Sequence, residues 1–206
     1  MAKTDDPNPD SHPQGGTVPG TDGDRRAQLV DAAVDHVAAH GIADVSLRRL
    51  GAAIGVSHRM LIHYFGSKEQ LLVEIVRTSE RRRRELLSQL RLEPGLSSVE
   101  AARRLWHRLT DPGLAGQERL FFELCGQALR GRPEAVPVLD GLVSDWLEPL
   151  VAAETAAGAD PVSARNRARF GLATVRGLLL DLLATGDRAG VDAALEEFLR
   201  LYYGPE

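Results

Sequence analysis

Apolar residues recur three and four positions apart along most of the chain after residue 23, the spacing of one face of an α-helix. Serine or aspartate before these stretches and glycine or proline after them mark the expected helix ends. The pattern predicts an all-α fold of about nine helices, with Pro149 kinking one of them. The expected ranges are 24–40, two short helices within 46–66, then 68–90, 97–110, 117–130, 134–157, 162–185 and 189–203.

The segment that begins at Ser46 predicts two short helices joined by a tight turn, with a third helix directly behind them. Ser46 is placed to cap the first helix, and Leu47 and Leu50 give that helix an apolar face. Gly55 follows its last turn, where a left-handed backbone is expected, and Ser57 precedes the second helix. This is the order of a helix-turn-helix, which places its second helix in the major groove of DNA.

Several polar side chains of this segment suit contacts with DNA. The Arg59 guanidinium has the geometry to bind guanine, and Lys68 puts a cation beside the free N–H groups of a helix start. The same glycine-x-serine turn also occurs in helical bundles that do not bind DNA, so this alternative stays open. The predicted DNA-contacting residues are Ser46, Arg48, Arg49, Ser57, His58, Arg59, Met60, His63, Tyr64 and Lys68.

Residues on both sides of the predicted turn form a longer pattern. The series consists of residues 26–33, Gly41, residues 45–47, residues 55–57 and the run 64–72, Tyr-Phe-Gly-Ser-Lys-Glu-Gln-Leu-Leu. From about Arg25 to Leu72 the chain thereby resembles the DNA-binding domain of the TetR/AcrR family of bacterial transcriptional regulators. Ile62 departs from the family, which usually has a tyrosine there that contacts the DNA backbone, and His36 replaces an apolar residue. Because isoleucine has no hydroxyl, Ile62 removes one expected contact with a phosphate.

The net charge of −4 is unevenly distributed along the chain. Residues 24–91 carry about twelve basic and about eight acidic side chains, roughly +4, whereas the residues from 92 onward sum to roughly −5. The basic part coincides with the predicted helix-turn-helix, as attraction to phosphates requires.

The remaining composition excludes several classes of protein. Cys125 is the only cysteine, which rules out an intrachain disulfide and suits a reducing cytoplasm. We expect no membrane span, signal peptide, metal site or cofactor, and no arrangement of residues favours an enzyme. Residues 1–23, rich in Asp, Pro, Gly, Ser and Thr, predict a disordered tail.

Four consecutive arginines, residues 81–84, interrupt the long helix after Ser67. Such a run is compatible with nucleic-acid binding, but we interpret it as the solvated middle of a helix that leaves the DNA-binding domain. The resemblance implies that this helix joins two domains and transmits a ligand signal. The predicted domains are therefore a helix-turn-helix domain over 24–70 and a helical domain for effector binding and dimerisation over 71–206.

The last two predicted helices carry stripes of small and leucine residues, including Gly177 and Ala194, that suit close helix packing. The resemblance implies a homodimer formed by these helices, and core packing is the alternative. It also implies an effector cavity in the second domain, whereas the aromatic side chains there, taken one by one, favour packing in the core. The predicted ligand-binding residues are Trp106, Phe121, Phe122, Cys125, Trp146, Phe170 and Arg176.

Together these features predict a cytoplasmic, homodimeric regulator that binds a palindromic double-stranded operator and is released from it by an unknown small molecule. The competing hypothesis is a ligand-sequestering or protein-interaction module that has lost DNA binding, which the replacement at Ile62 keeps open.

Overall fold

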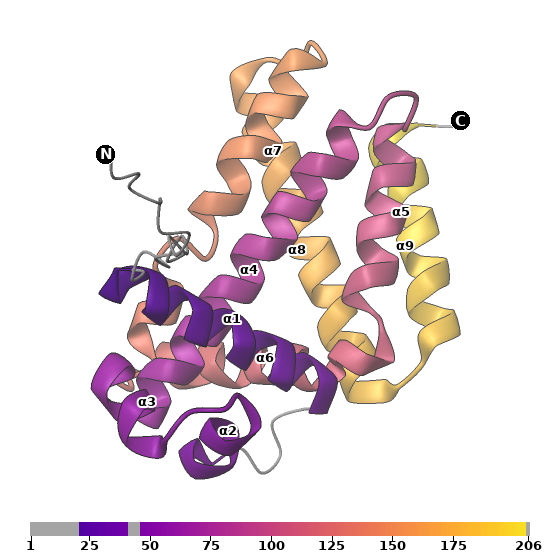
Figure 1. Cartoon of the computed structure of the whole chain (residues 1–206). Helices are drawn as coiled ribbons and strands as arrows, with labels where there is room; N and C mark the ends of the chain where they lie inside the picture. Colours follow the sequence, from indigo (N-terminus) through magenta and orange to yellow (C-terminus); the bar gives the residue numbers. More distant parts are fainter. Residues whose placement is uncertain (1–20, 41–45, 205–206) are drawn as a thin grey trace, which may run out of the picture.

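A computed structural model describes residues 21–40 and 46–204, which form nine α-helices and two short 3₁₀ helices (Figure 1). The predicted all-α fold is confirmed. The described helices are α1 (Asp22–His40), α2 (Leu47–Ala53), α3 (His58–Phe65), α4 (Lys68–Leu92), α5 (Ser98–Leu109), η1 (Pro112–Leu114), α6 (Ala115–Leu129), η2 (Val136–Leu139), α7 (Ser144–Ala156), α8 (Pro161–Thr185) and α9 (Arg188–Tyr203).

The expected N-terminal tail falls almost entirely outside the described residues, as do Gly41 and Val45. Helix α1 begins at Asp22, so residues 22 and 23 are helical and not part of a tail.

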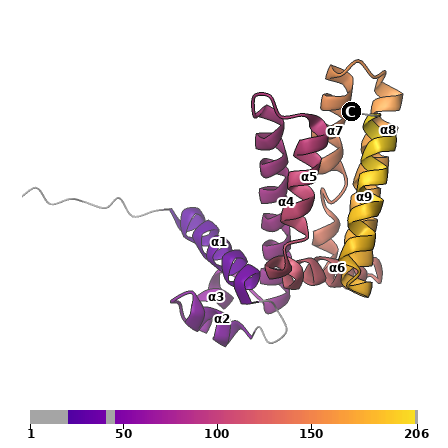
Figure 2. The ribbon, with the colours of Figure 1, turned by 90° about the vertical axis from the view of Figure 1, so that its right-hand side faces the viewer.

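Helices α1, α2 and α3 pack together against the first turns of α4. Val37 and Leu50 are fully buried there, and Leu61 and Phe65 of α3 point into the same core. Figure 2 shows this group beside the lower end of α4, separate from the upright helices of the rest of the chain. The two short helices therefore sit at one end of the molecule.

Helix α4 is long because it belongs to both parts of the molecule. Its N-terminal half packs on α1 and α3. Its C-terminal half stands among the upright helices, where it packs on α5 (Figure 2) and pairs with Asp145 of α7 through Arg84. Helix α6 crosses the base of these upright helices, where Leu120 and Phe121 join the core that begins in α1. Helices α4 and α6 thus connect the two parts by continuous packing.

One predicted helix was wrong in its extent. The segment 134–157 is not a single kinked helix, because residues 136–139 form a 3₁₀ turn and Gly141 takes a left-handed backbone with φ of 71°. Helix α7 begins only at Ser144 and carries Pro149 inside it.

Among the described helices, none is long and apolar enough to cross a lipid bilayer.

Candidate functional sites

The outer face of α3 is formed mainly by polar side chains, with Ile62 also exposed. Leu61 and Phe65 are buried, whereas His58, Arg59 and His63 are exposed and Met60 is half-buried. This division follows from the helical period, which turns residues three and four apart to the same side. The face has the donors that a recognition helix needs for the edges of bases.

Serine caps fix the starts of the three helices around the turn. Ser46 Oγ accepts from the Arg49 amide at 3.2 Å, and Ser57 Oγ accepts from the Met60 amide at 3.1 Å. The cap at Ser67 uses the Gln70 amide at 3.1 Å. Because side-chain caps stabilise the first turn, the direction of α3 is set locally.

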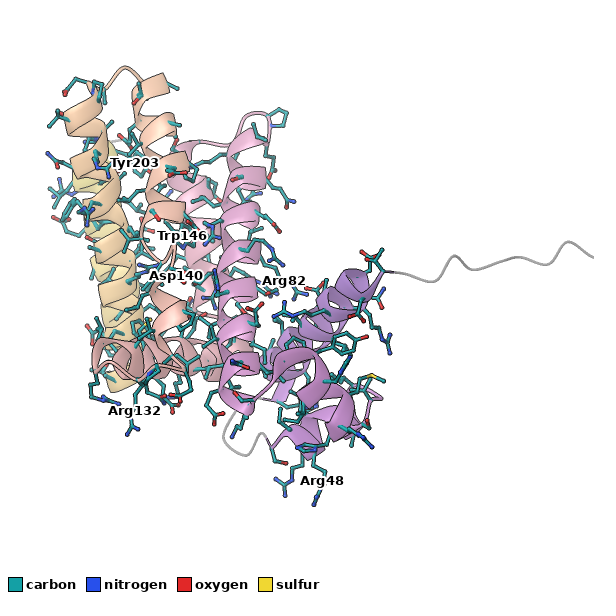
Figure 3. The ribbon with its side chains drawn as sticks, turned by 90° about the vertical axis from the view of Figure 1, so that its left-hand side faces the viewer. Arg48, Arg82, Arg132, Asp140, Trp146 and Tyr203 are labelled. Atoms are coloured by element: carbon teal, nitrogen blue, oxygen red, sulfur yellow. The ribbon has the colours of Figure 1, made fainter. Side chains whose placement is uncertain are left out.

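The cations around α3 are directed away from the body of the protein. Arg48 points outward at the end of the molecule where α2 and α3 lie (Figure 3), and Arg49, Arg59 and Lys68 are also exposed. No described carboxylate forms an ion pair with Arg48, Arg59 or Lys68. Unpaired guanidinium and ammonium groups at one end of a protein are suited to binding phosphates.

Tyr64 has a partner within the protein. Its hydroxyl donates to Asp22 Oδ1 at 2.9 Å, which joins α3 to the first turn of α1. The hydrogen bond to this carboxylate, together with burial and the carboxylate's charge, raises the pKa of the phenol. The predicted phosphate contact by Tyr64 therefore competes with an existing hydrogen bond.

The sequence led us to interpret the four arginines of α4, residues 81–84, as the solvated middle of a helix. This interpretation was wrong, because the four side chains are not uniformly exposed to solvent. Successive residues point about 100° apart around a helix, and each guanidinium meets a different acid. Arg81 pairs with Glu85, Arg82 with Asp31 and Asp35 of α1, and Arg84 with Asp145. Arg83 is buried, with 9% of its surface exposed.

An apolar cavity of about 110 Å³ lies among the upright helices, with α6 at its base. Trp106, Phe121 and Trp146 contribute aromatic walls, and Phe198 and Tyr202 of α9 close another side. Figure 3 shows Trp146 in the interior between the helices. A mostly apolar space of this kind, bordered by a small number of polar groups, is typical of sites for small molecules.

Three buried charged residues, Glu80, Arg83 and Glu118, border this cavity together with the half-buried Arg176, and we call the four the ionic cluster. Glu80 accepts from Arg83 at 2.7 Å, from Arg176 at 3.2 Å and from the Trp146 indole at 2.9 Å. Arg83 also donates to Glu118 Oε1. Two acids thus lie against one buried and one half-buried guanidinium, and a buried charge requires such a partner.

The two acids of the ionic cluster are held differently. Burial on its own raises the pKa of Glu80, but the charges of Arg83 and Arg176 and the hydrogen bonds from Trp146 and Arg83 bring it below its ordinary value. Burial raises the pKa of Glu118 to about 7, and Glu80 adds to this while Arg83 opposes it. Glu118 Oε2 is buried and has no hydrogen-bond partner.

The structure separates the predicted ligand-binding residues into two groups. Trp106, Phe121, Trp146 and Arg176 border the cavity. Phe122 and Cys125 are half-buried in the packing of α6 and do not line it. Phe170 is 57% exposed, and its ring packs edge-on against Phe198 from outside.

Sequence reasoning missed Glu80, Arg83 and Glu118. A signal was present, because the helical period places Glu118 on the same stripe of α6 as Phe121, Phe122 and Cys125. A charged residue within an apolar stripe indicates a buried partner or a ligand.

Within residues 21–40 and 46–204, no group of acidic, histidine or cysteine side chains is arranged to hold a metal ion.

Comparison with known proteins is most informative for the first part of the chain. Residues 29–75 match the family described as bacterial regulatory proteins, tetR family. A stretch of 54 residues is 44% identical to the HTH-type transcriptional regulator BetI of Agrobacterium fabrum and covers 26% of each chain. The chain is thus similar to this curated relative over about a quarter of the relative's length.

Solved structures match over most of the chain. A transcriptional regulator from a Rhodococcus species has a TM-score of 0.65 at 22% identity, with 86% of this chain and 95% of that chain covered. The multidrug binding protein EbrR, complexed with imidazole, has a TM-score of 0.57 at 25% identity, with 86% and 94% covered. The fold described above is therefore shared over most of the chain.

Proposed function

Residues 29–75 of this chain belong to the tetR family of bacterial regulatory proteins, and from that premise we propose that the protein is a ligand-responsive transcriptional repressor. The observation that carries the proposal is the exposed polar face of α3, with His58, Arg59 and His63, at the end of the molecule remote from the cavity. The face would enter the major groove, and the unpaired cations beside it would bind phosphates. The protein would act by binding, in the cytoplasm, and not as an enzyme.

Operator recognition would require two copies of the chain. Helix α8 presents a stripe of exposed small and apolar residues, Phe170, Ala173, Gly177, Leu180 and Ala184, spaced three and four apart. Leu201 of α9 is 66% exposed beside it. A contiguous apolar stripe of this kind marks a protein interface. Packing of α8 and α9 on the same helices of a second copy would give a two-fold dimer for a palindromic site.

Helix α4 would couple the cavity to the DNA-binding face. Arg83 belongs to the ionic cluster, and its neighbour Arg82 binds Asp31 at 2.9 Å and Asp35 at 2.6 Å on α1. Arg26 of α1 also pairs with Glu74 of α4 at 3.3 Å. A ligand that displaced this part of α4 would therefore also move α1, together with α2 and α3. The distance between the two recognition helices of the dimer would then change.

EbrR, with a similar fold, is a multidrug binding protein, which supports a ligand role for the cavity.

The test is binding to the DNA upstream of the protein's own gene, measured by fluorescence anisotropy at 50 and 200 mM salt. Affinity should fall steeply with salt, because phosphate contacts release counterions. Arg59→Ala should weaken binding by about 1–3 kcal/mol, roughly 5- to 150-fold. The matched control is Arg104→Ala, which removes an exposed arginine at the far end of the molecule, where Arg104 pairs with Glu93 and Glu100.

Binding that is weak, insensitive to salt and equal in the two variants would contradict the proposal. That result would favour the competing hypothesis of a ligand-sequestering or protein-interaction module. Ile62, which is 37% exposed on α3 and offers no hydrogen-bond donor, is the observation that keeps this second candidate.

A further inference from the structure

The outer face of α3 contains one large apolar side chain among its polar ones. His58, Arg59 and His63 are exposed on this face, and Ile62 lies among them with 37% of its surface exposed. It follows His58 by four positions and Arg59 by three, so the helical period keeps these side chains on one side of the helix. Met60, in contrast, is half-buried against the core. Ile62 therefore stands in the middle of the surface that would face DNA.

The position and the shape of Ile62 distinguish it from an ordinary surface residue. A single exposed apolar side chain elsewhere on a protein needs no functional explanation. Ile62, however, would be covered by base edges once α3 entered the major groove, so its apolar surface would be removed from water. As a β-branched residue it has one strongly preferred rotamer in a helix, which keeps the entropy lost on binding small. Ile62 thus presents a fixed apolar surface to the groove.

The major groove offers few partners to an apolar side chain. Among the groups that distinguish the four bases in that groove, only the C5 methyl of thymine is apolar, and the others are hydrogen-bond donors and acceptors. A donor or acceptor that lost its water to Ile62 would be left without a partner, which weakens binding. Contact with a methyl group has no such penalty. Thymine is therefore the base that suits this side chain.

The neighbouring Arg59 indicates where this thymine lies. Its guanidinium is exposed, no carboxylate of the described residues pairs with it, and its fork suits O6 and N7 of guanine. Residues 59 and 62 are about 4.5 Å apart along the helix axis. Bases of one DNA strand follow each other every 3.4 Å or so, at about the same spacing. With α3 lying along the groove, Arg59 and Ile62 would therefore meet adjacent base pairs.

We propose that Ile62 is a specificity-determining residue, which contacts the C5 methyl of a thymine in the base pair next to the guanine bound by Arg59. The inference rests on the proposed function and deepens it, because it assigns two adjacent base pairs of each half-site to two side chains. It also explains the departure from the family at this position. A tyrosine bound to a phosphate carries no sequence information, whereas an isoleucine on a thymine methyl selects one base.

The test removes only the methyl group. Footprinting of the DNA upstream of the protein's own gene locates the half-sites, and each thymine is then replaced in turn by deoxyuridine, which keeps every hydrogen-bonding group. In anisotropy titrations of the full, unmodified chain, one thymine of each half-site should respond with about fourfold weaker binding, the equivalent of about 0.8 kcal/mol for one buried carbon. Replacement in both half-sites should weaken binding about 15-fold, because distant sites are additive.

The variant Ile62→Ala assigns this effect to the side chain. It should bind the thymine and deoxyuridine duplexes about equally, because the methyl has lost its partner. Ile62→Val retains both branches at Cβ and should retain most of the fourfold difference. The matched control is Leu92→Ala, which shortens an aliphatic side chain that is 82% exposed at the far end of α4. This control should leave the fourfold difference unchanged.

The guanine is located with a second base analogue. Replacement of a guanine by 7-deazaguanine removes the N7 acceptor, so Arg59→Ala should weaken binding less on the duplex that lacks the N7 bound by Arg59. That guanine should lie in the base pair next to the thymine identified with deoxyuridine. The two analogues leave the protein unmodified, so they locate both bases even if a variant does not fold.

Three results would overturn the proposal. These are the absence of any thymine that responds to loss of its methyl, an equal response in wild type and Ile62→Ala, and a responding thymine that is not adjacent to the guanine. In each of them the chain still binds its operator, so the proposed function stands. Absence of salt-dependent binding to the upstream DNA would instead refute the proposed function, and this inference with it.

Discussion

Glu80 should contribute more to stability than any exposed acid of α4, because it is buried and neutralises the buried guanidinium of Arg83 and the half-buried one of Arg176. In Glu80→Gln the charge is lost and an amide NH₂ replaces one oxygen. Since Glu80 accepts three hydrogen bonds, one of the three donors would then face another donor. Arg83 and Arg176 would share only Glu118 as a compensating acid.

The expected loss follows from this geometry. Removing one partner of a buried ion pair costs about 3–5 kcal/mol, and the retained amide oxygen places Glu80→Gln near the lower limit, about 3 kcal/mol. In a chain of this length, 1 kcal/mol shifts the melting temperature by about 2–4 °C. The variant should therefore melt about 6–12 °C lower.

The matched control is Glu85→Gln on the same helix. Glu85 pairs with Arg81 at 3.7 Å, and both side chains are more than half exposed. Exposed pairs contribute about 0–1 kcal/mol. Urea unfolding followed by circular dichroism gives both free energies, with Glu80→Gln expected to lie about 2 kcal/mol or more below the control.

A second variant checks the cause of the loss. Arg176→Gln in the Glu80→Gln background restores the charge balance, so the double variant should lose less than the sum of the two single losses. Our reasoning would be refuted by a loss in Glu80→Gln no greater than that in Glu85→Gln, or by strict additivity of the pair.

Three further outcomes are expected. Leu180→Asp should convert the dimer to a monomer in sedimentation, whereas Leu129→Asp, at an exposed leucine of α6, should not; a dimer in both would exclude α8 from the interface. Tyr64→Phe should change operator affinity less than threefold, because the hydroxyl is bound to Asp22; a larger loss in anisotropy would show that it contacts DNA. The raised pKa of Glu118 contributes stability that is fully present below pH 4.5 and is lost as the pH rises through about 7. The unfolding free energy of the wild type, compared with that of Glu118→Gln, should therefore fall from pH 5 to pH 8. A difference that stays constant over this range would contradict the raised pKa.

Local features were predicted well because their causes are local. The caps at Ser57 and Ser67 depend on residues three positions away, and the glycine turn at Gly55, with φ of 73°, depends only on its own backbone. The segment 134–157 was predicted less well. Its apolar residues have helical spacing, but the backbone reverses at Gly141, and only the packing around it determines that the helix starts later.

The four arginines at 81–84 show that the sequence does not identify contacts between residues far apart in the chain. Four identical residues have identical propensities, so propensity gives no basis for separating Arg83 from its neighbours. Their environments differ because α6 brings Glu118 and α1 brings Asp31 and Asp35 to different sides of α4. These partners lie between 35 and 51 positions away along the chain.

The sequence by itself determined most of the helices, the turn between α2 and α3, and the polar face of α3, because these features depend on hydrogen bonds between near neighbours and on the helical period. Only the tertiary structure decided which charged groups were buried together, that Phe170 lies on the surface, and that Glu118 borders the cavity with one oxygen unpaired. Those properties depend on which helix packs against which, and helical periodicity places a side chain on a face without identifying the helix that covers it.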